Sequence, residues 1–335
     1  MPLYLTLLLS LTLLIPLGGY PGAPDWQAWA LWCVVGLAAV LIPLPVVLER
    51  RSHKPGPMLW LWVGFALARS LAAAQRSDLI SLCHLLSAWT AVMAALYAER
   101  RPARVRIALR WMAIPLGIVA LIQAMPYQQN IFINRNTLGM ALIPPLAAWL
   151  PDDHRVRGTL LIPLVGILLT LSRGAMISAA LMAAWYWSLL PVALPATAAV
   201  IPALLAIRNP ATLRIHADYW LAGWRGLLES PLIGLGAARL GSADLVGHAH
   251  NVILTVASWS GLVGLGLVGW GITRARDGWG MLLRWGRAGV IGLALAGLAD
   301  DWTLHPLIMA MAGAMMMISA ARRKTPQRLP AQSRI

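Results

Sequence analysis

Apolar stretches recur along the whole chain, separated by short polar or proline-containing breaks. We expect neither a soluble catalytic domain nor a cleavable leader, because no segment is distinct enough from the rest to form one. The composition agrees: 59% of the residues are apolar and 12% are charged, whereas about 45–50% apolar is usual for a soluble domain. The pattern predicts an all-α, polytopic membrane protein that forms a single integral membrane domain over 1–335.

Twelve segments are candidates for transmembrane helices. The weakest assignment is the region 174–207, which as one straight helix would reach about 51 Å, far more than the roughly 30 Å hydrocarbon core. Pro191 and Pro195 favour a hairpin of two spans there. The twelve predicted spans are 3–19, 27–48, 57–74, 79–98, 105–125, 133–150, 158–172, 174–189, 192–207, 250–271, 285–300 and 304–320.

The basic residues predict the orientation of these spans. The net charge is +15, and 25 of the 27 basic residues are arginine. If the N-terminus is cytoplasmic, 19 of the 27 fall in inside segments, seven fall in outside segments and Arg69 lies within a span. Lysine and arginine accumulate in short cytoplasmic loops. We therefore expect both termini in the cytoplasm, and we attribute the basic charge to topology and not to nucleic-acid binding.

The outer-face arginines need a separate explanation. The apolar runs Thr137–Leu150 and Thr159–Leu171 hold 14 and 13 residues, whereas a straight span needs about 20. Their outer ends, Asn134-Arg135-Asn136 and Ser172-Arg173, should therefore lie below the outer surface, and Arg69 should lie inside the membrane. Intramembrane arginines are costly unless they are paired or face a wet cavity, so these are candidate site residues. The alternative is that they snorkel and cap helix ends.

The longest hydrophilic segment, 208–249, is predicted to be an outside loop that contains an amphipathic helix at the membrane surface. Ser230-Pro231 should end this helix. Arg214 and Arg225 each precede an acidic residue by four positions, which is the spacing of helical ion pairs. They would alternatively present planar guanidinium groups to an anionic ligand. The apolar positions at three- and four-residue steps are Leu213, Ala217, Trp220, Trp224, Leu227 and Leu228.

A histidine pair follows this loop, in the segment Gly247-His248-Ala249-His250-Asn251 directly before the tenth span. Histidine is the side chain best suited to act as a base near neutral pH, so this segment is a candidate reaction centre. Alternatively, Asn251 caps the helix and the histidines are interfacial. A metal site would need a further ligand, for which only Asp244 is near in sequence.

Other polar and sulfur-containing residues are less specific. Asp300, Asp301 and His305 form a second outer cluster, which would either orient the base or cap adjoining helices. Cys33 and Cys83 each lie inside a predicted span, which argues against a disulfide framework or a zinc site. We expect no metal and no cofactor.

Four short motifs follow one another between residues 130 and 270, all on the predicted outer face. They are Phe132-Ile133-Asn134-Arg135-Asn136-Thr137-Leu138-Gly139, Thr170-Leu171-Ser172-Arg173-Gly174-Ala175, Trp220 followed by Ser230-Pro231-Leu232-Ile233-Gly234-Leu235-Gly236, and His250-Asn251 followed by Gly261-Leu262-Val263-Gly264. In this order and placement they resemble the O-antigen ligase and Wzy-type polysaccharide polymerase superfamily. The first 130 residues are similar only in being membrane spans.

Two positions depart from the pattern of that superfamily. The arginine usual about four residues before the loop tryptophan is His216 here, and Arg214 lies two residues earlier. Either Arg214, Arg225 or both would therefore take its role. Two residues before Gly261, relatives often have an acidic residue, whereas this chain has Trp259.

The resemblance implies a GT-C-like fold and a metal-independent, inverting glycosyltransferase of the bacterial inner membrane. Its donor would be a glycan on undecaprenyl diphosphate, bound at the periplasmic face. Arg173 and Arg214 would hold the diphosphate, with Arg69, Arg135 or Arg225 in support, and His250 would deprotonate the acceptor hydroxyl. The further substrate-binding candidates are Asn134, Asn136, His216, His248, Asn251 and Asp301.

The acceptor remains open at this stage. It would be the outer-core sugar of lipid A in a ligase, a growing glycan chain in a polymerase, or a protein serine in an oligosaccharyltransferase. A transporter or channel that uses the same polar cavity is an alternative from a different class. Transporters often contain internal repeats and midplane charges, whereas this sequence has no evident repeat and its polar residues gather at the outer face.

Overall fold

The computed structural model describes residues 25–48, 56–75, 79–100, 102–125, 135–150, 158–189, 210–236, 249–299 and 305–324. Every regular element within these ranges is a helix, so the all-α prediction is confirmed for them. Two of the predicted spans, 3–19 and 192–207, lie outside the described residues. The site candidates Asn134, His248 and Asp301 also lie outside them.

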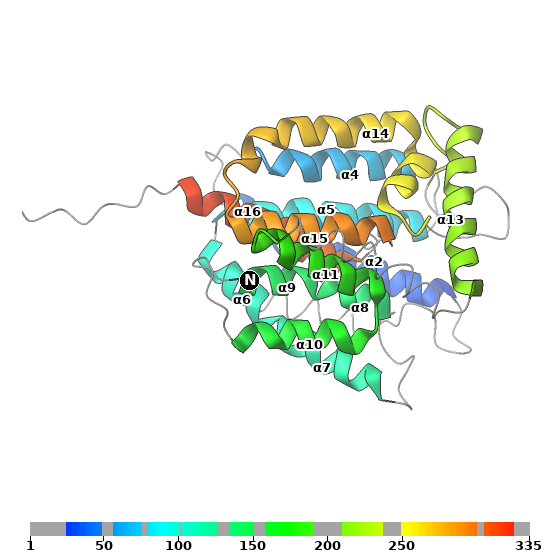
Figure 1. Cartoon of the computed structure of the whole chain (residues 1–335). Helices are drawn as coiled ribbons and strands as arrows, with labels where there is room; N and C mark the ends of the chain where they lie inside the picture. The colour runs from blue at the N-terminus through cyan, green and yellow to red at the C-terminus, as the bar shows by residue number, and fades with distance from the viewer. Residues whose placement is uncertain are drawn as a thin grey trace, which may run out of the picture.

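Most of the helices run side by side as a bundle, and α13 crosses one end of it (Figure 1). The predicted loop helix is therefore present. The elements are α2 Asp25–Leu41, α3 Leu44–Leu48, α4 Leu59–Ala74, α5 Leu79–Arg100, α6 Pro102–Trp111, α7 Ala113–Ala124, α8 Arg135–Ala141, α9 Ile143–Trp149, the 3₁₀ turn η1 Gly158–Leu160, α10 Leu161–Thr170, α11 Arg173–Tyr186, α13 Pro210–Glu229, α14 Val252–Trp279, α15 Arg284–Ala299 and α16 Pro306–Lys324.

Three stretches of the described chain are both long and apolar enough to cross a membrane: Ser81–Glu99, Arg104–Ala124 and Val252–Trp279. Shorter apolar helices cover Leu59–Ala74 and Gly158–Thr170, and a third covers Leu307–Met317. These segments indicate that the protein associates with a membrane. The total of twelve spans stays a prediction.

Three of the predicted spans are each broken into two helices near prolines, and 27–48 is one of them, divided into α2 and α3 beside Pro43. The span 105–125 consists of α6 and α7, and the span 133–150 consists of α8 and α9. Pro115 lies in the first turn of α7 and Pro144 in the first turn of α9, where the missing N–H of proline is tolerated. The junction residues keep local bonds: Met112 N donates to Ala108 O (3.0 Å) and Leu142 N donates to Leu138 O (3.2 Å).

Small residues allow the central helices to approach closely, as is common in membrane helix pairs. α4 packs along α14, and α5 packs along α16. A Cβ atom on Gly64 of α4 would overlap the carbonyl oxygen of Leu267 in α14, and one on Gly313 of α16 would overlap the backbone of Ala91 in α5. The core of α16 is the segment Leu307–Met317, whose residues are all buried.

Two arginines near the start of the 102–125 segment are engaged by the end of α9. Arg106 Nη2 donates to Leu150 O (3.3 Å), and Arg110 Nε donates to Ala148 O (2.8 Å). Ala148 lies in the last turn of α9 and Leu150 is its C-cap, and this end of a helix carries partial negative charge. Both arginines thus bind the carbonyl end of a helix.

Candidate functional site

The first two motifs meet where α8 packs against the turn between α10 and α11. A Cβ atom on Gly139 of α8 would lie 2.7 Å from the Cβ of Ala175 and 2.9 Å from the Cβ of Ser172. Because the packing is this close, the start of α8 lies beside the start of α11. Arg135 and Asn136, one turn before Gly139, are both half-buried there.

The turn that carries Arg173 is fixed by hydrogen bonds between its own residues. Thr170 Oγ1 donates to Ile167 O (2.6 Å) and accepts from Ser172 N (3.3 Å). Leu171 adopts a left-handed conformation (φ 52°), and Ser172 Oγ accepts from Ala175 N (3.4 Å) to cap α11. Arg173 is therefore held as the first residue of α11, half-buried. Its guanidinium adds to the partial positive charge of a helix N-terminus, which favours anions.

His250 is the second strained position of the site, since its φ is 48°. Two side chains of α13 contact its imidazole edge-on: His216 with ring centroids 5.1 Å apart, and Tyr219 with centroids 4.5 Å apart. Trp220 Nε1 donates to the carbonyl oxygen of His250 (3.4 Å). The loop helix thus fixes both the ring and the backbone of the proposed base.

Asn251 caps α14, as one of the two sequence-based interpretations stated. Its Oδ1 accepts from Ile253 N (2.9 Å) and Leu254 N (3.0 Å). Its Nδ2 donates to Leu298 O in α15 (3.1 Å). Because α15 also packs against α11, it connects the helix that follows His250 to the helix that begins with Arg173. The N-terminal ends of α8, α11 and α14 lie at the end of the bundle that α13 crosses (Figure 1).

α13 docks on α14 through its small residues. A Cβ atom on Gly223 would lie 2.8 Å from the Cβ of Ala249, and one on Gly226 would lie 3.1 Å from the Cβ of Ser258. The apolar face predicted for this helix does not form the contact with α14, since Trp220 is 44% and Trp224 is 51% exposed. Arg214 and Arg225 are also exposed, and the residue that reaches His250 is His216. His216, one of the two positions that depart from the motif pattern, therefore contacts the proposed base.

α14 is interrupted at Gly261, whose backbone (φ 61°, ψ −159°) is not helical. In a continuous helix, the N–H groups of Leu262 and Val263 would donate to the carbonyls of Ser258 and Trp259. An unsatisfied backbone group is costly inside a membrane protein, so these four groups need other partners.

The loop 231–236, which follows α13, supplies all four partners. The two N–H groups that follow the break in the chain donate to the loop, and the two carbonyls that precede it accept from the loop. The bonds are Leu262 N to Pro231 O (2.8 Å), Val263 N to Leu232 O (3.0 Å), Leu235 N to Ser258 O (2.8 Å) and Gly236 N to Trp259 O (3.0 Å). Two bonds within one helix are thereby replaced by four bonds between two segments.

Glycine is required on both sides of this arrangement. Gly234 (φ 74°) and Gly236 (φ 82°) lie in the loop, and Gly261 lies in the helix. A Cβ atom on Gly234 would overlap the backbone of Trp259, and one on Gly261 would overlap the backbone of Leu232. The Pro-Leu-x-Gly-x-Gly motif and the later glycine step are therefore two halves of one structural feature.

Arg69 and Gln75 of the α4 segment lie against this feature. Gln75 Nε2 donates to Ile233 O (2.7 Å) and approaches Trp259 O (3.5 Å). Arg69 is only 2% exposed, and its guanidinium lies 4.7 Å from the ring centroid of Trp259 and 5.1 Å from that of Phe65. Arg69 thus packs against the interrupted part of α14, on the face of the Trp259 ring.

Sequence reasoning missed Tyr219 and Gln75 as site residues. Tyr219 adjoins the motif residue Trp220, and Gln75 is a polar residue just after a predicted span, but neither signal is specific. Among the described residues, no group of three or more His, Cys, Asp or Glu side chains is arranged to hold a metal. Cys33 and Cys83 bring their Sγ atoms within 3.1 Å, between α2 and α5.

No family model matches the chain, and no curated protein matches its sequence.

Proposed function

We propose that the protein is a glycosyltransferase of the bacterial inner membrane, which moves a glycan from undecaprenyl diphosphate to an acceptor hydroxyl. The acceptor we favour is a lipid A–core sugar, as in an O-antigen ligase. The observation that carries the proposal is the position of backbone strain. Of the three non-glycine residues with a positive φ in the described part of the chain, two lie in the motifs: Leu171 directly precedes the Ser172-Arg173 turn, and His250 is the proposed base. Such strain persists where the surrounding structure enforces it, typically at functional sites.

In the proposed reaction, Arg173 and Arg135 bind the donor diphosphate, and we keep Asn134 and Asn136 as further candidates for contacts to it. The planar guanidinium group matches phosphate oxygens in a bidentate manner. His250 accepts the proton of the acceptor hydroxyl as the oxygen attacks the anomeric carbon. The bond from that carbon to the diphosphate breaks, and undecaprenyl diphosphate leaves with both electrons while the arginines stabilise its charge.

The residues around this centre take supporting roles. His216 orients the ring of His250, and Asn251 orders the start of α14. We assign glycan contacts to the exposed Arg214 and Arg225, as well as to His248 and Asp301. Arg69, buried against the ring of Trp259, holds the segment of α14 next to Gly261 in place. In this proposal twelve spans place the site at the periplasmic face, with both termini in the cytoplasm.

A transporter is the second candidate, because interrupted helices form the binding sites of many transporters. In those proteins, unwound backbone groups coordinate the cargo. In α14 the backbone groups freed at Gly261 are bonded to the loop 231–236, which favours a structural role for the interruption. Counter-flow of labelled solute by the reconstituted protein, without glycan transfer, would support the transporter instead.

The deciding experiment reconstitutes the purified protein with an undecaprenyl-diphosphate glycan and resolves the products on a gel. A lipid A–core acceptor tests the ligase, a second undecaprenyl-linked glycan tests the polymerase, and a serine-containing protein tests the oligosaccharyltransferase. We expect His250→Ala to lower the rate at least about 100-fold, since general base catalysis contributes roughly 10²–10⁴-fold. Arg274→Ala, at an exposed arginine of α14, is the control and should retain activity. Full activity of folded His250→Ala would contradict the assignment of the base.

A further inference from the structure

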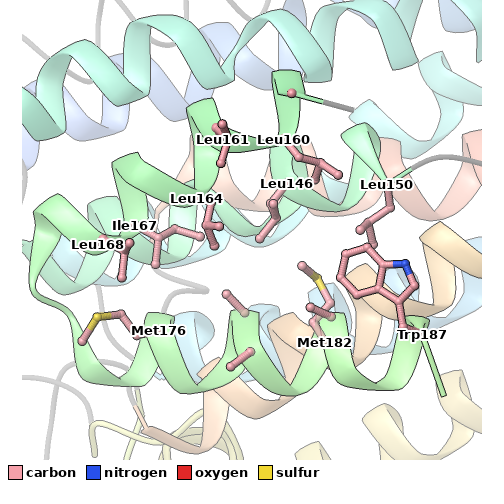
Figure 2. Close-up of a pocket in the computed structure, with 14 residues that line it drawn as sticks. Leu146, Leu150, Leu160, Leu161, Leu164, Ile167, Leu168, Met176, Met182 and Trp187 are labelled. Carbon is pink, nitrogen blue, oxygen red and sulfur yellow. The ribbon is translucent and has the colours of Figure 1, made fainter. Parts of the chain in front are cut away.

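A groove of about 520 Å³ lies between α10 and α11, with the end of α9 at its base. Figure 2 shows Leu164 and Leu168 of α10 on one side, and Met176 and Met182 of α11 on the other. Leu146 comes from α9, and Leu150 directly follows that helix. Apart from the indole of Trp187, which has one N–H group, the side chains that line the groove are aliphatic or thioether groups, so the groove suits a hydrocarbon ligand far better than a sugar.

We propose that this groove binds the polyprenyl chain of the lipid diphosphate donor. The inference rests on the proposed function and extends it, because it assigns a place to the part of the donor that does not react. The groove follows α11 from Met176 to Trp187. Eleven residues of helix correspond to about 16 Å, roughly half of the hydrocarbon core of a bilayer.

Charge at one end of the groove selects the kind of lipid. Arg173 precedes Met176 by three residues, which places a cation and a helix N-terminus one turn beyond the apolar lining. Arg135 begins α8, which packs on the same turn. A ligand with an anionic head and one long apolar chain satisfies both parts. The diphosphate would lie at Arg173, and the first isoprene units would enter the groove at Met176.

Small residues on α11 and exposed residues on both helices would allow a branched chain to enter the groove from the side. On α11 the lining residues Ala179, Ala180 and Ala183 are small, which leaves room for the methyl branches of an isoprenoid. Leu168 of α10 is 51% exposed and Ala180 of α11 is exposed as well. The groove is therefore open between α10 and α11 in the described part of the chain, and in this proposal the donor chain enters there from the side.

Filling the groove tests the proposal. Ala183→Phe should raise the KM for a C55 diphosphate donor about tenfold, the effect of leaving roughly two CH₂ groups unburied. The KM for a donor with two isoprene units and the kcat with either donor should stay unchanged. Val165→Phe is the matched control, because this exposed α10 residue lies outside the groove lining. If Ala183→Phe is folded and its KM for the C55 donor is unchanged, the proposal is wrong. If this variant does not fold, Ala180→Leu is measured with the same expectations.

A binding experiment separates failure of this inference from failure of the proposed function. The wild-type protein in nanodiscs is labelled with a glycan-free, photoreactive polyprenyl diphosphate. We expect labelled peptides from α10 and α11, and displacement of the label by undecaprenyl diphosphate but not by phosphatidylglycerol. Labelling elsewhere, or equal displacement by phosphatidylglycerol, overturns the groove assignment. Labelling of the groove in a protein that transfers no glycan to any acceptor overturns the proposed function alone.

Discussion

The interruption of α14 at Gly261 differs from the breaks at the proline-containing junctions of α6 with α7 and α8 with α9. At the proline junctions, the N–H groups of Met112 and Leu142 still bond four residues back along the chain. At Gly261, the backbone groups on both sides bond to the loop 231–236 instead. A proline break is therefore satisfied locally, whereas the glycine break makes one membrane helix dependent on a distant segment.

This dependence links the loop helix to the proposed base. α13 is continuous with the loop that bonds to the break, and its His216 and Tyr219 contact His250. The part of α14 that precedes Gly261 in the chain begins directly after Asn251. The direction of that short helix, and with it the position of His250, thus depends on the bonds at Gly261. The two kinds of break should therefore respond very differently to mutation.

The largest effect is expected for Gly261→Ala. Alanine strongly disfavours this backbone conformation, at a cost of about 1–3 kcal/mol. Its Cβ would also overlap Leu232, and loss of the loop bonds adds about 0.5–1.5 kcal/mol each. We expect the free energy of unfolding to fall by at least about 3 kcal/mol and transfer to be lost, measured by thermal melting in detergent and by the product gel.

Gly266→Ala on the same helix is the matched control, because a Cβ there meets no atom within 4 Å. It should leave the melting temperature unchanged or raise it, since alanine has a higher helix propensity than glycine by about 1 kcal/mol. Equal stability of the two variants would show that the loop is not needed to hold α14 interrupted.

An intermediate effect is expected for Gln75→Leu, which removes the bond from Nε2 to Ile233 O. Loss of this bond should cost about 1 kcal/mol and loosen the loop more than the bundle. Hydrogen exchange should accelerate in the loop 231–236 and in Ser258–Val263, and kcat should fall more than KM rises. Thr273→Val is the control, because Thr273 Oγ1 donates only to Trp270 O within α14. Unchanged exchange in both segments would exclude a positioning role for Gln75.

The two kinds of break also differ in how far the sequence alone predicted them. Apolar runs located the helices, since hydropathy is a local property, and Pro115 and Pro144 carry a local signal for a break. Gly261 appeared only as part of a motif, because its effect depends on hydrogen bonds to residues about 30 positions away. No hydropathy pattern reports that non-local pairing.

The same reasoning applies to the candidate site. Arg173 and Asn251 were both predicted as site residues from residue type and position, and the cap that Asn251 forms was the alternative interpretation of that residue. The docking face of α13 was not predicted, because Ala222, Gly223 and Gly226 carry no amphipathic signal. Gln75 and the contact of Arg69 with Trp259 are likewise products of tertiary packing, which a single sequence does not specify.

The smallest effect is expected for Pro115→Ala. Pro115 lies in the first turn of α7, where proline is tolerated because its missing N–H would lack a helical partner anyway. Alanine restores an N–H group and removes a constraint on the unfolded chain, so the change in unfolding free energy should stay within about 1 kcal/mol of wild type. Transfer activity should be unchanged, measured beside Gly261→Ala under identical conditions. A loss as large as that of Gly261→Ala would show that the proline junctions also hold the site in place, and the distinction between local and non-local breaks would fail.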